Sequence, residues 1–154
     1  TLIELLVVIT MIGILVSIAL ASYSGAQRRG RDTRRKTDLD TLKKAFELAK
    51  QDTAGQYFYP VCTPTANSCN LTDSNTTPAL APASNPYIKA VPRDPTSNTG
   101  YYYTTQTASG GPCNASCASY TLVACLENEK DAQKDSTTHA SCTSPLVSYT
   151  VTPN

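Results

Sequence analysis

The chain has 154 residues, of which 40% are hydrophobic and 16% are charged, and its formal net charge is +1. This length allows one small globular domain beside one long helix and excludes a multidomain protein. The sequence contains neither a phosphate-binding loop nor a nucleophile elbow, and its single histidine, His139, lies in a polar stretch. We therefore expect a protein that is not an enzyme and that needs no cofactor and no metal.

The first predicted element is an apolar helix at the N-terminus, TLIELLVVITMIGILVSIALASY. Every side chain from Leu5 to Ala21 is apolar or small. About 20 such residues in a helix are long enough to cross a hydrocarbon core of about 30 Å. The segment lacks the basic start of a cleaved secretory signal, so we interpret it as a retained membrane span. The one acid, Glu4, lies at the edge of this span. We expect it to pair with a positive charge, because burial of an unpaired charge in a bilayer costs several kcal/mol.

The helical pattern continues beyond the membrane segment. Through KTDLDTLKKAFELAK, apolar residues recur three and four positions apart, which predicts one buried stripe on a helix. The stripe consists of Leu39, Leu42, Ala45, Phe46 and Ala49. We therefore predict one helix of about 50 residues that ends near residues 53–55, with Gly13 and Gly25 as its points of flexibility.

Basic side chains gather where the apolar and amphipathic halves of this helix meet. Six basic residues stand there against one acid, Asp32, whereas the chain from residue 37 onward has seven basic and ten acidic residues. Such a run is usually a solvated helix face, which can meet acids of a neighbouring molecule; the alternatives are DNA and anionic lipid headgroups. We name Arg28, Arg29, Arg31, Arg34, Arg35 and Lys36 the basic patch.

Six cysteines follow the apolar segment. An even number of cysteines in a small, loop-rich domain indicates disulfides and an oxidising compartment, whereas a zinc site would need tighter ligand pairs. Among the many pairings that six cysteines allow, proximity in the sequence favours Cys62 with Cys69, Cys113 with Cys117, and Cys125 with Cys142. An exported domain conflicts with the basic patch, which normally marks the cytoplasmic side. A basic leader that once preceded Thr1 and was later removed would reconcile the two.

Four stretches rich in tyrosine, valine and threonine predict antiparallel strands. The segment between the first two, residues 62–99, holds more than half of the prolines and is predicted to be a long loop. A sheet this small leaves one face uncovered, and the amphipathic helix stripe can cover it. The predicted fold is therefore α+β, a long helix packed on a small antiparallel sheet with disulfide-stapled loops. The predicted strands are residues 55–61, 100–107, 119–127 and 146–152.

The N-terminal sequence TLIELLVVITMIGILVSIALASYSGAQ resembles the mature N-terminus of type IV pilins and pseudopilins, in which a phenylalanine is followed by TLIEL and a long apolar run. The resemblance is close over about the first 27 residues and architectural beyond them. It implies that Glu4 matches the family's fifth-position glutamate and that a methylated phenylalanine precedes Thr1 after cleavage by a prepilin peptidase. The helix proline common in the family would fall at Ala21 and is absent here. This leaves Gly13 and Gly25 as the expected flexible points.

A second, weaker resemblance lies in the segment AVPRDPTSNTGYYYT. Pseudopilins of type II secretion carry a similar proline and aspartate turn before an aromatic strand, although the tryptophan that often follows is absent here. The alternative is that Asp94 and Pro95 simply start a turn before a strand. The segment does not separate a pilus subunit from a secretion subunit.

The resemblance implies a structural subunit with two parts: a transmembrane and filament-core helix at residues 1–26, and a globular head at residues 27–154. Glu4 would pair with the positive N-terminus of a neighbouring subunit, and such head-to-tail contacts build an open helical filament. The expected assembly residues are Thr1, Leu2, Ile3, Glu4 and Leu5.

We expect a major pilin that forms a homopolymer, an extracellular type IV pilus at the cell surface. Its task stays open among cell adhesion, twitching motility, DNA uptake and surface sensing, because all of these can use the same subunit. Before assembly it would be a single-pass inner-membrane protein that meets the pilus assembly machinery. The alternative within the family is a pseudopilin of a type II secretion pseudopilus. The alternative from another class is a monomeric, membrane-anchored extracellular binding domain.

Overall fold

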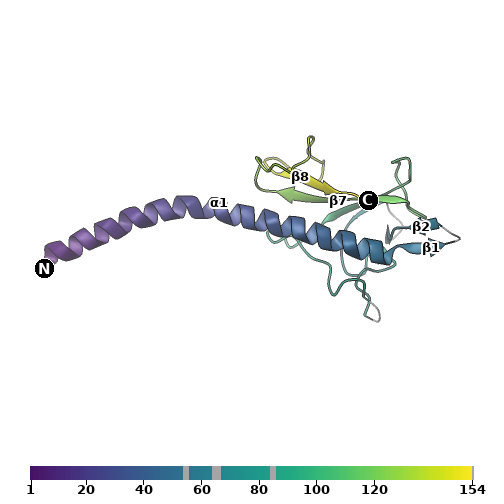
Figure 1. Ribbon diagram of the computed structural model, residues 1–154, viewed down its shortest axis with the longest axis horizontal. Helices are drawn as coiled ribbons and strands as arrows, with labels where there is room; N and C mark the ends of the chain where they lie inside the picture. Colours follow the sequence, from purple (N-terminus) through teal and green to yellow (C-terminus); the bar gives the residue numbers. More distant parts are fainter. Residues whose placement is uncertain (54–55, 64–66, 84–85, 154) are drawn as a thin grey trace.

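The computed structural model describes residues 1–53, 56–63, 67–83 and 86–153, and within these it does not describe the side chains of residues 21, 22, 51–53, 56 and 57. One continuous helix, α1 (Leu2–Ala49), has 48 residues and projects far beyond the head as a gently curved rod (Figure 1). The prediction of one long helix is confirmed. Helical structure runs on through Gly13 and Gly25, so their role as flexible points stays a prediction.

The helix ends earlier than predicted. Lys50 takes an extended conformation, with φ of −60° and ψ of 121°, and the chain continues at once into β1 (Gln51–Thr53). This strand pairs antiparallel with β2 (Gln56–Phe58), so that Gln51 stands opposite Phe58. The backbone groups of residues 51–53 bond to this hairpin partner in place of a further helical turn, which explains the earlier end.

The head contains a four-stranded antiparallel sheet in the order β4-β6-β7-β8. The inner strand β6 alternates buried and less buried residues, as expected of a sheet with one covered face, and β7 does so except at residues 122–124, which are all buried. The α+β fold class is confirmed, and three of the four predicted strands lie in this sheet. The strands are β4 (Ser68–Asn70), β6 (Tyr102–Gln106), β7 (Ser119–Leu126) and β8 (Val147–Val151).

The predictions for residues 55–61 and 62–99 are partly wrong. The first stretch stays outside the main sheet and contributes to β2 and to β3 (Val61–Cys62), which pairs with β5 (Thr76–Thr77). The fourth strand of the main sheet, β4, lies within the predicted loop instead. Serine, cysteine and asparagine have weak strand preference, so pairing with β6, and not local propensity, decides this strand.

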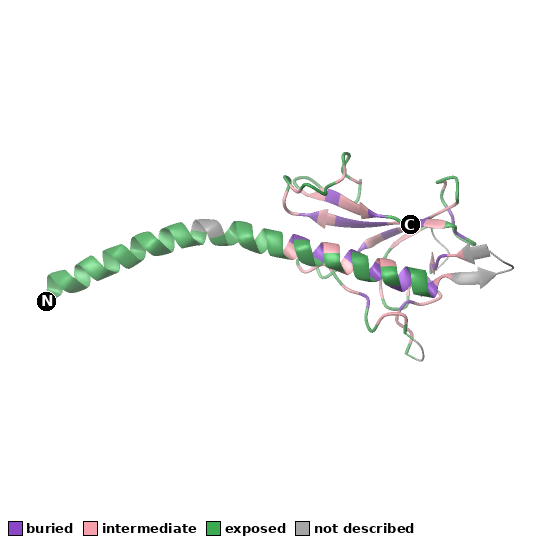
Figure 2. Ribbon diagram, in the orientation of Figure 1, coloured by how far each residue is buried: buried purple, intermediate pink, exposed green. Residues whose placement is uncertain are grey.

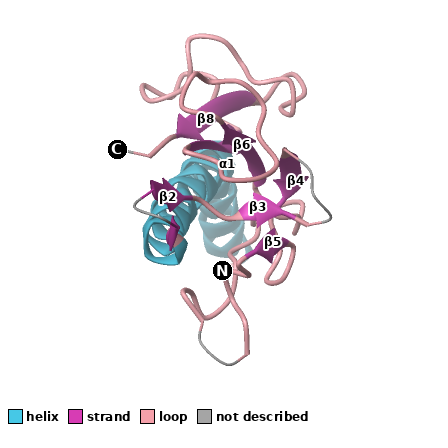
Figure 3. Cartoon of the chain, turned by 90° about the vertical axis from the view of Figure 1, so that its right-hand side faces the viewer, coloured by secondary structure: helices cyan, strands magenta, loops and turns pink. Residues whose placement is uncertain are grey.

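The amphipathic half of α1 covers the inner face of the sheet. The end-on view shows β6 and β8 on one side of α1 and the small β3-β5 pair beside it (Figure 3). All five residues of the predicted stripe are buried, and Phe46 stacks on Tyr103 with ring centroids 4.5 Å apart. Burial of such a side chain contributes about 2–3 kcal/mol. Buried bands appear on α1 only along the head (Figure 2).

Three disulfides close loops of the head, and they account for all six cysteines. Each joins cysteines that are close in the sequence, so the pairing is the one that proximity favoured, and the expectation of disulfide-stapled loops is confirmed. The bonds are Cys62–Cys69, Cys113–Cys117 and Cys125–Cys142.

Candidate assembly interface

In the N-terminal half of α1, all residues whose side chains the structure describes are exposed, and this half projects beyond the head (Figure 2). The exposed fraction of its large hydrophobic residues ranges from 42% at Val7 to 84% at Leu2. A monomeric soluble protein rarely exposes a contiguous apolar surface of more than a few hundred Å². In the part of the chain that the structure describes, α1 is also the one helix long and apolar enough to cross a membrane. This surface therefore needs lipid or protein around it.

Glu4 lies at the far end of this apolar surface. Its carboxylate accepts hydrogen bonds from the N-terminal amine of Thr1 and, at 3.1 Å, from the Thr1 hydroxyl. The predicted neighbours Leu2, Ile3 and Leu5 are all exposed around it. The Thr1 hydroxyl is thus a partner of the carboxylate within one subunit. The pairing of Glu4 with a neighbouring subunit stays a prediction.

The basic patch does not form one solvated face. Arg35 is only 3% exposed, and Arg31 and Lys36 form ion pairs with acids of the head, so the prediction of a solvated surface is wrong for these three residues. Arg28, Arg29 and Arg34 remain exposed. The sequence did not reveal this division, because the partner acids of Arg35 from the head lie 59 and 92 residues away.

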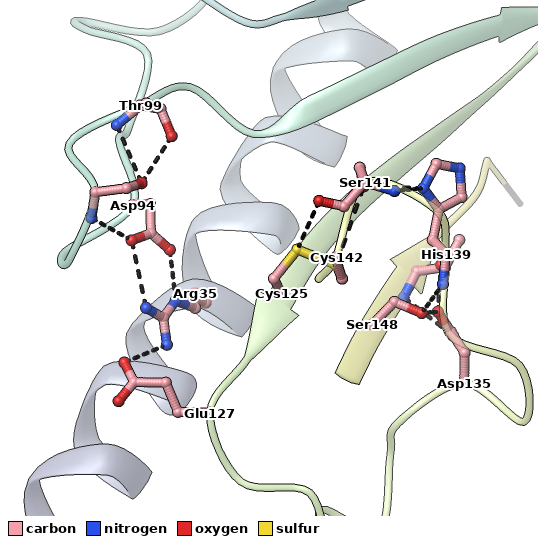
Figure 4. Close-up of a disulfide and its surroundings, with 12 residues drawn as sticks. Arg35, Asp94, Thr99, Cys125, Glu127, Asp135, His139, Ser141, Cys142 and Ser148 are labelled. Carbon is pink, nitrogen blue, oxygen red and sulfur yellow. Dashed lines mark hydrogen bonds and ion pairs between the residues drawn. A yellow bond between two sulfur atoms is a disulfide. The ribbon is translucent and has the colours of Figure 1, made fainter. Parts of the chain in front are cut away.

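Arg35 is the centre of an ion-pair cluster between α1 and the head (Figure 4). Its Nε donates to Oδ2 of Asp94 at 2.5 Å, and one terminal nitrogen donates to Asp32 at 2.8 Å and to Glu127 at 2.9 Å. Arg31 adds two hydrogen bonds to the Glu127 carboxylate, at 2.8 and 2.5 Å. The guanidinium forks match carboxylates in two-point contacts, which fixes distance and angle together. The cluster therefore sets the position of α1 against the head.

Two acids of this cluster also order the backbone. Asp32, only 2% exposed, accepts hydrogen bonds from the backbone N–H groups of Glu127 and Asn128, both at 2.9 Å, just after β7. Asp94 accepts from the backbone N–H groups of Thr96 at 2.8 Å and Ser97 at 2.9 Å. The interpretation of Asp94 as a turn starter is confirmed. The sequence did not show that the same turn is held to α1.

The electrostatics of the cluster keep Asp94 and Glu127 ionised at neutral pH. Burial opposes ionisation of Asp94, but hydrogen bonds from Arg35 and from the backbone of the turn outweigh it and lower the pKa of Asp94 to about 2. Hydrogen bonds from Arg31, and further ones from Arg35, likewise lower the pKa of Glu127 to about 2. The cluster thus stays charged and bonded over the ordinary pH range.

Lys36 extends these contacts to the connection between β7 and β8. Its Nζ donates to Asp131 at 2.7 Å and to Gln133 at 2.9 Å, and it lies 5.5 Å from the ring centroid of Tyr149. The loop that carries these partners continues to the Cys125–Cys142 disulfide. One turn of α1 therefore holds three segments of the head that are distant in the sequence.

The residues around His139 do not form a proton relay. Ser148 donates to Asp135 at 2.5 Å, but it accepts from the backbone N–H of His139 and not from its ring, whose Nδ1 contacts Ser141 (Figure 4). A catalytic triad needs the imidazole between the hydroxyl and the carboxylate. This arrangement supports loop structure.

Comparison with curated proteins finds the type II secretion system core protein G of Escherichia coli strain K12, which is 32% identical over 100 residues. The match covers 64% of this chain and 66% of that protein, so it spans slightly less than two thirds of the relative. No family model matches the chain. No solved structure is a significant match.

The relative is a pseudopilin, a structural protein of the type IV pilin-like kind. Its similarity agrees with the resemblance of the N-terminal motif and with the architecture of a long N-terminal helix followed by small antiparallel sheets and disulfides. On these grounds the chain is a homologue of a type II secretion pseudopilin, which is a type IV pilin-like protein.

Proposed function

We propose that this chain is a structural subunit that packs its apolar helix against those of neighbouring copies in a helical filament. The observation that carries the proposal is the exposed apolar half of α1, which is joined without a break to a half fixed on the head. A rod of this kind can bury its surface only against lipid or against other rods. Identical head-to-tail contacts that do not close generate a filament.

The filament that fits the comparison is a short pseudopilus of a type II secretion system. Its support is the similarity to core protein G, which is named as a component of the type II secretion system. The second candidate is an extracellular type IV pilus with this chain as its major pilin. It is supported by the TLIEL motif, which resembles that of the pilins.

We infer two successive states of the subunit, one anchored in a membrane and one assembled in a filament. The apolar half first anchors the chain in the inner membrane, and the disulfides favour a head on the oxidising side. A prepilin peptidase and an assembly machinery are the partners that this pathway requires. The same helix then leaves the lipid and enters the filament core, where neighbouring helices replace the acyl chains.

In this proposal Glu4 sets the register in which the helix of one subunit packs against the helix of the next. Within one subunit the Thr1 hydroxyl donates to this carboxylate at 3.1 Å. In the filament core the carboxylate would exchange this partner for the amine of an adjacent subunit, and a desolvated pair of charges is far stronger than an exposed one. Loss of one partner from a buried pair costs about 3–5 kcal/mol, because an unpaired charge remains. A monomeric anchored domain, the alternative from another class, has no such requirement.

The experiment is to express Glu4→Ala and the wild-type chain in cells that assemble it, and to quantify filaments in sheared material by electron microscopy and immunoblot. A matched control is Asp40→Asn, which removes one negative charge from an exposed position of the same helix. We expect Glu4→Ala to reach the membrane at normal levels but to lose filaments by at least about tenfold, because one lost charge pair weakens every subunit contact. Equal filament yields from Glu4→Ala and Asp40→Asn would refute the proposal.

A further inference from the structure

The basic patch divides into residues that the head neutralises and residues that it leaves free. Arg31, Arg35 and Lys36 pair with acids of the head. Arg28 and Arg29 are exposed, and no hydrogen bond or ion pair joins their side chains to another residue in the ranges described above. Arg34 is exposed as well, and Arg28 and Arg29 lie at the end of the head that faces the apolar half of α1.

The position of these two arginines along α1 corresponds to the headgroup layer of a membrane. Tyr23, 62% exposed, is the last large side chain of the apolar half, and tyrosine is typical of membrane interfaces. At 1.5 Å per residue, Arg28 and Arg29 follow it by about 7–9 Å. The headgroup layer adds about 5–8 Å to each side of the hydrocarbon core, so long arginine side chains at this level reach lipid phosphates.

A second segment adds a basic residue at the same place. The turn after β7 brings Lys130 beside the two arginines around a shallow depression of about 280 Å³. One acid at its edge, Glu127, already bonds Arg31 and Arg35, which leaves Glu129 as the acid facing three cations. We name Arg28, Arg29 and Lys130 the junction site. Its two guanidinium groups can each bind a phosphate in two-point contact, and the ammonium adds a third cation.

We propose that the junction site binds the anionic phospholipid headgroups of the membrane that holds the subunit before assembly. The inference rests on the membrane-anchored stage of the proposed function. Headgroup contacts at two segments would hold the head at a defined height and tilt above the bilayer. The helix would release these contacts when it leaves the membrane for the filament.

The test uses the full chain reconstituted in vesicles of phosphatidylcholine alone or mixed with phosphatidylglycerol. Trypsin cleaves after Arg28 and Arg29, and mass spectrometry reports the rate at each bond. We expect cleavage at these bonds to slow several-fold when phosphatidylglycerol is present, and high salt to remove most of this protection because it screens exposed charges. Equal rates in both vesicles, from a chain that resists carbonate extraction, would overturn the junction site and leave the proposed function intact. A chain that carbonate extracts would overturn both.

Variants extend the test to single side chains. After extraction in mild detergent, the phosphatidylglycerol bound per subunit is measured for Arg28→Gln, Arg29→Gln and the matched control Lys44→Gln, an exposed residue about 22 Å further along the same helix than Arg29. We expect each arginine variant to lose bound lipid several-fold and the control to retain it. Equal retention in all three would refute the site. Protection of the arginine bonds by a DNA oligonucleotide in phosphatidylcholine vesicles, without any effect of phosphatidylglycerol, would assign the surface to nucleic acid instead.

Discussion

The two halves of α1 share one backbone but differ in what stabilises them. Along the head, one face of the helix is buried on the sheet and the ion-pair cluster fixes its position. Along the N-terminal half, every side chain that the structure describes is exposed, including all the large apolar residues. Tertiary packing supplies most of the stability of helices in proteins. The first half therefore buries its apolar surface only within a membrane or an assembly, whereas the second half buries its apolar face in a single subunit.

The change between the halves is abrupt. Residues 23–30 are exposed, and burial begins at Arg31 and Asp32, where the acids of the head first reach the helix. The predicted boundary at residue 26 lies close to this point and stays a prediction. If the ion-pair cluster defines the boundary, loss of the cluster should destabilise only the half of α1 that the head covers.

The largest effect on this comparison is expected from Arg35→Ala. The substitution leaves the buried carboxylates of Asp32, Asp94 and Glu127 without their shared cation, which costs about 3 kcal/mol. Thermal unfolding of the full chain in detergent, followed by the near-ultraviolet signal of the head tyrosines, measures this loss. The matched control, Arg34→Ala, removes an exposed arginine from the adjacent position and should change stability by less than about 0.5 kcal/mol.

A combined variant sharpens this result. Arg35→Met together with Asp94→Asn and Glu127→Gln removes the arginine and two of its three carboxylates. Asp32 keeps its hydrogen bonds from the backbone N–H groups of residues 127 and 128, so part of the lost stability should return. Equal destabilisation by Arg35→Ala and Arg34→Ala would mean that the ion-pair cluster does not stabilise the packing of α1 on the head. The boundary between the exposed and the covered half of α1 would then depend on apolar packing alone.

Local and distant interactions explain which features the sequence could predict. The stripe from Leu39 to Ala49 recurs at helical spacing, so its burial could be read from neighbouring residues. The disulfides join cysteines separated by 4, 7 and 17 residues, and proximity was enough to pair them. Strand β4 and the partners of Arg35 depend on contacts between distant segments, which periodicity does not encode. The Asp94 turn was a visible signal, but its partner on α1 was not.

Acidic pH is expected to lower the stability of the head by a smaller amount. The pKa values of Asp94 and Glu127 are lowered in the folded head to about 2, from ordinary values of 3.8 and 4.5. A lowered folded-state pKa gives stability that is fully present above the unfolded pKa and is lost as the pH falls toward the folded value. We therefore expect the head to lose about 2 kcal/mol between about pH 4.5 and pH 2, because protons compete with the arginines.

The same unfolding signal, recorded across this pH range, checks the acid prediction. A variant with both Asp94→Asn and Glu127→Gln has no carboxylates to protonate at these positions, so its stability should fall less steeply with acid than that of the wild type. Identical slopes for the two proteins would assign the acid sensitivity to other groups. In either case the helicity of the N-terminal half should not follow the transition, because these acids lie on the head and its turn.

The smallest effect is expected from Gly13→Ala, and it concerns the half that the head does not touch. A Cβ atom at Gly13 would meet no other group within 4 Å, so alanine fits, and its higher helix propensity should stabilise the local helix by about 1 kcal/mol. Amide hydrogen exchange near residue 13 in detergent micelles should then slow about fivefold, whereas unfolding of the head should not change. The converse variant, Ala19→Gly, should speed local exchange by a similar factor. If Gly13→Ala also lowers filament yield while it stiffens the helix, then assembly uses the flexibility of Gly13. If yield is unchanged, the first half acts as a uniform rod, and its difference from the second half consists only in what surrounds it.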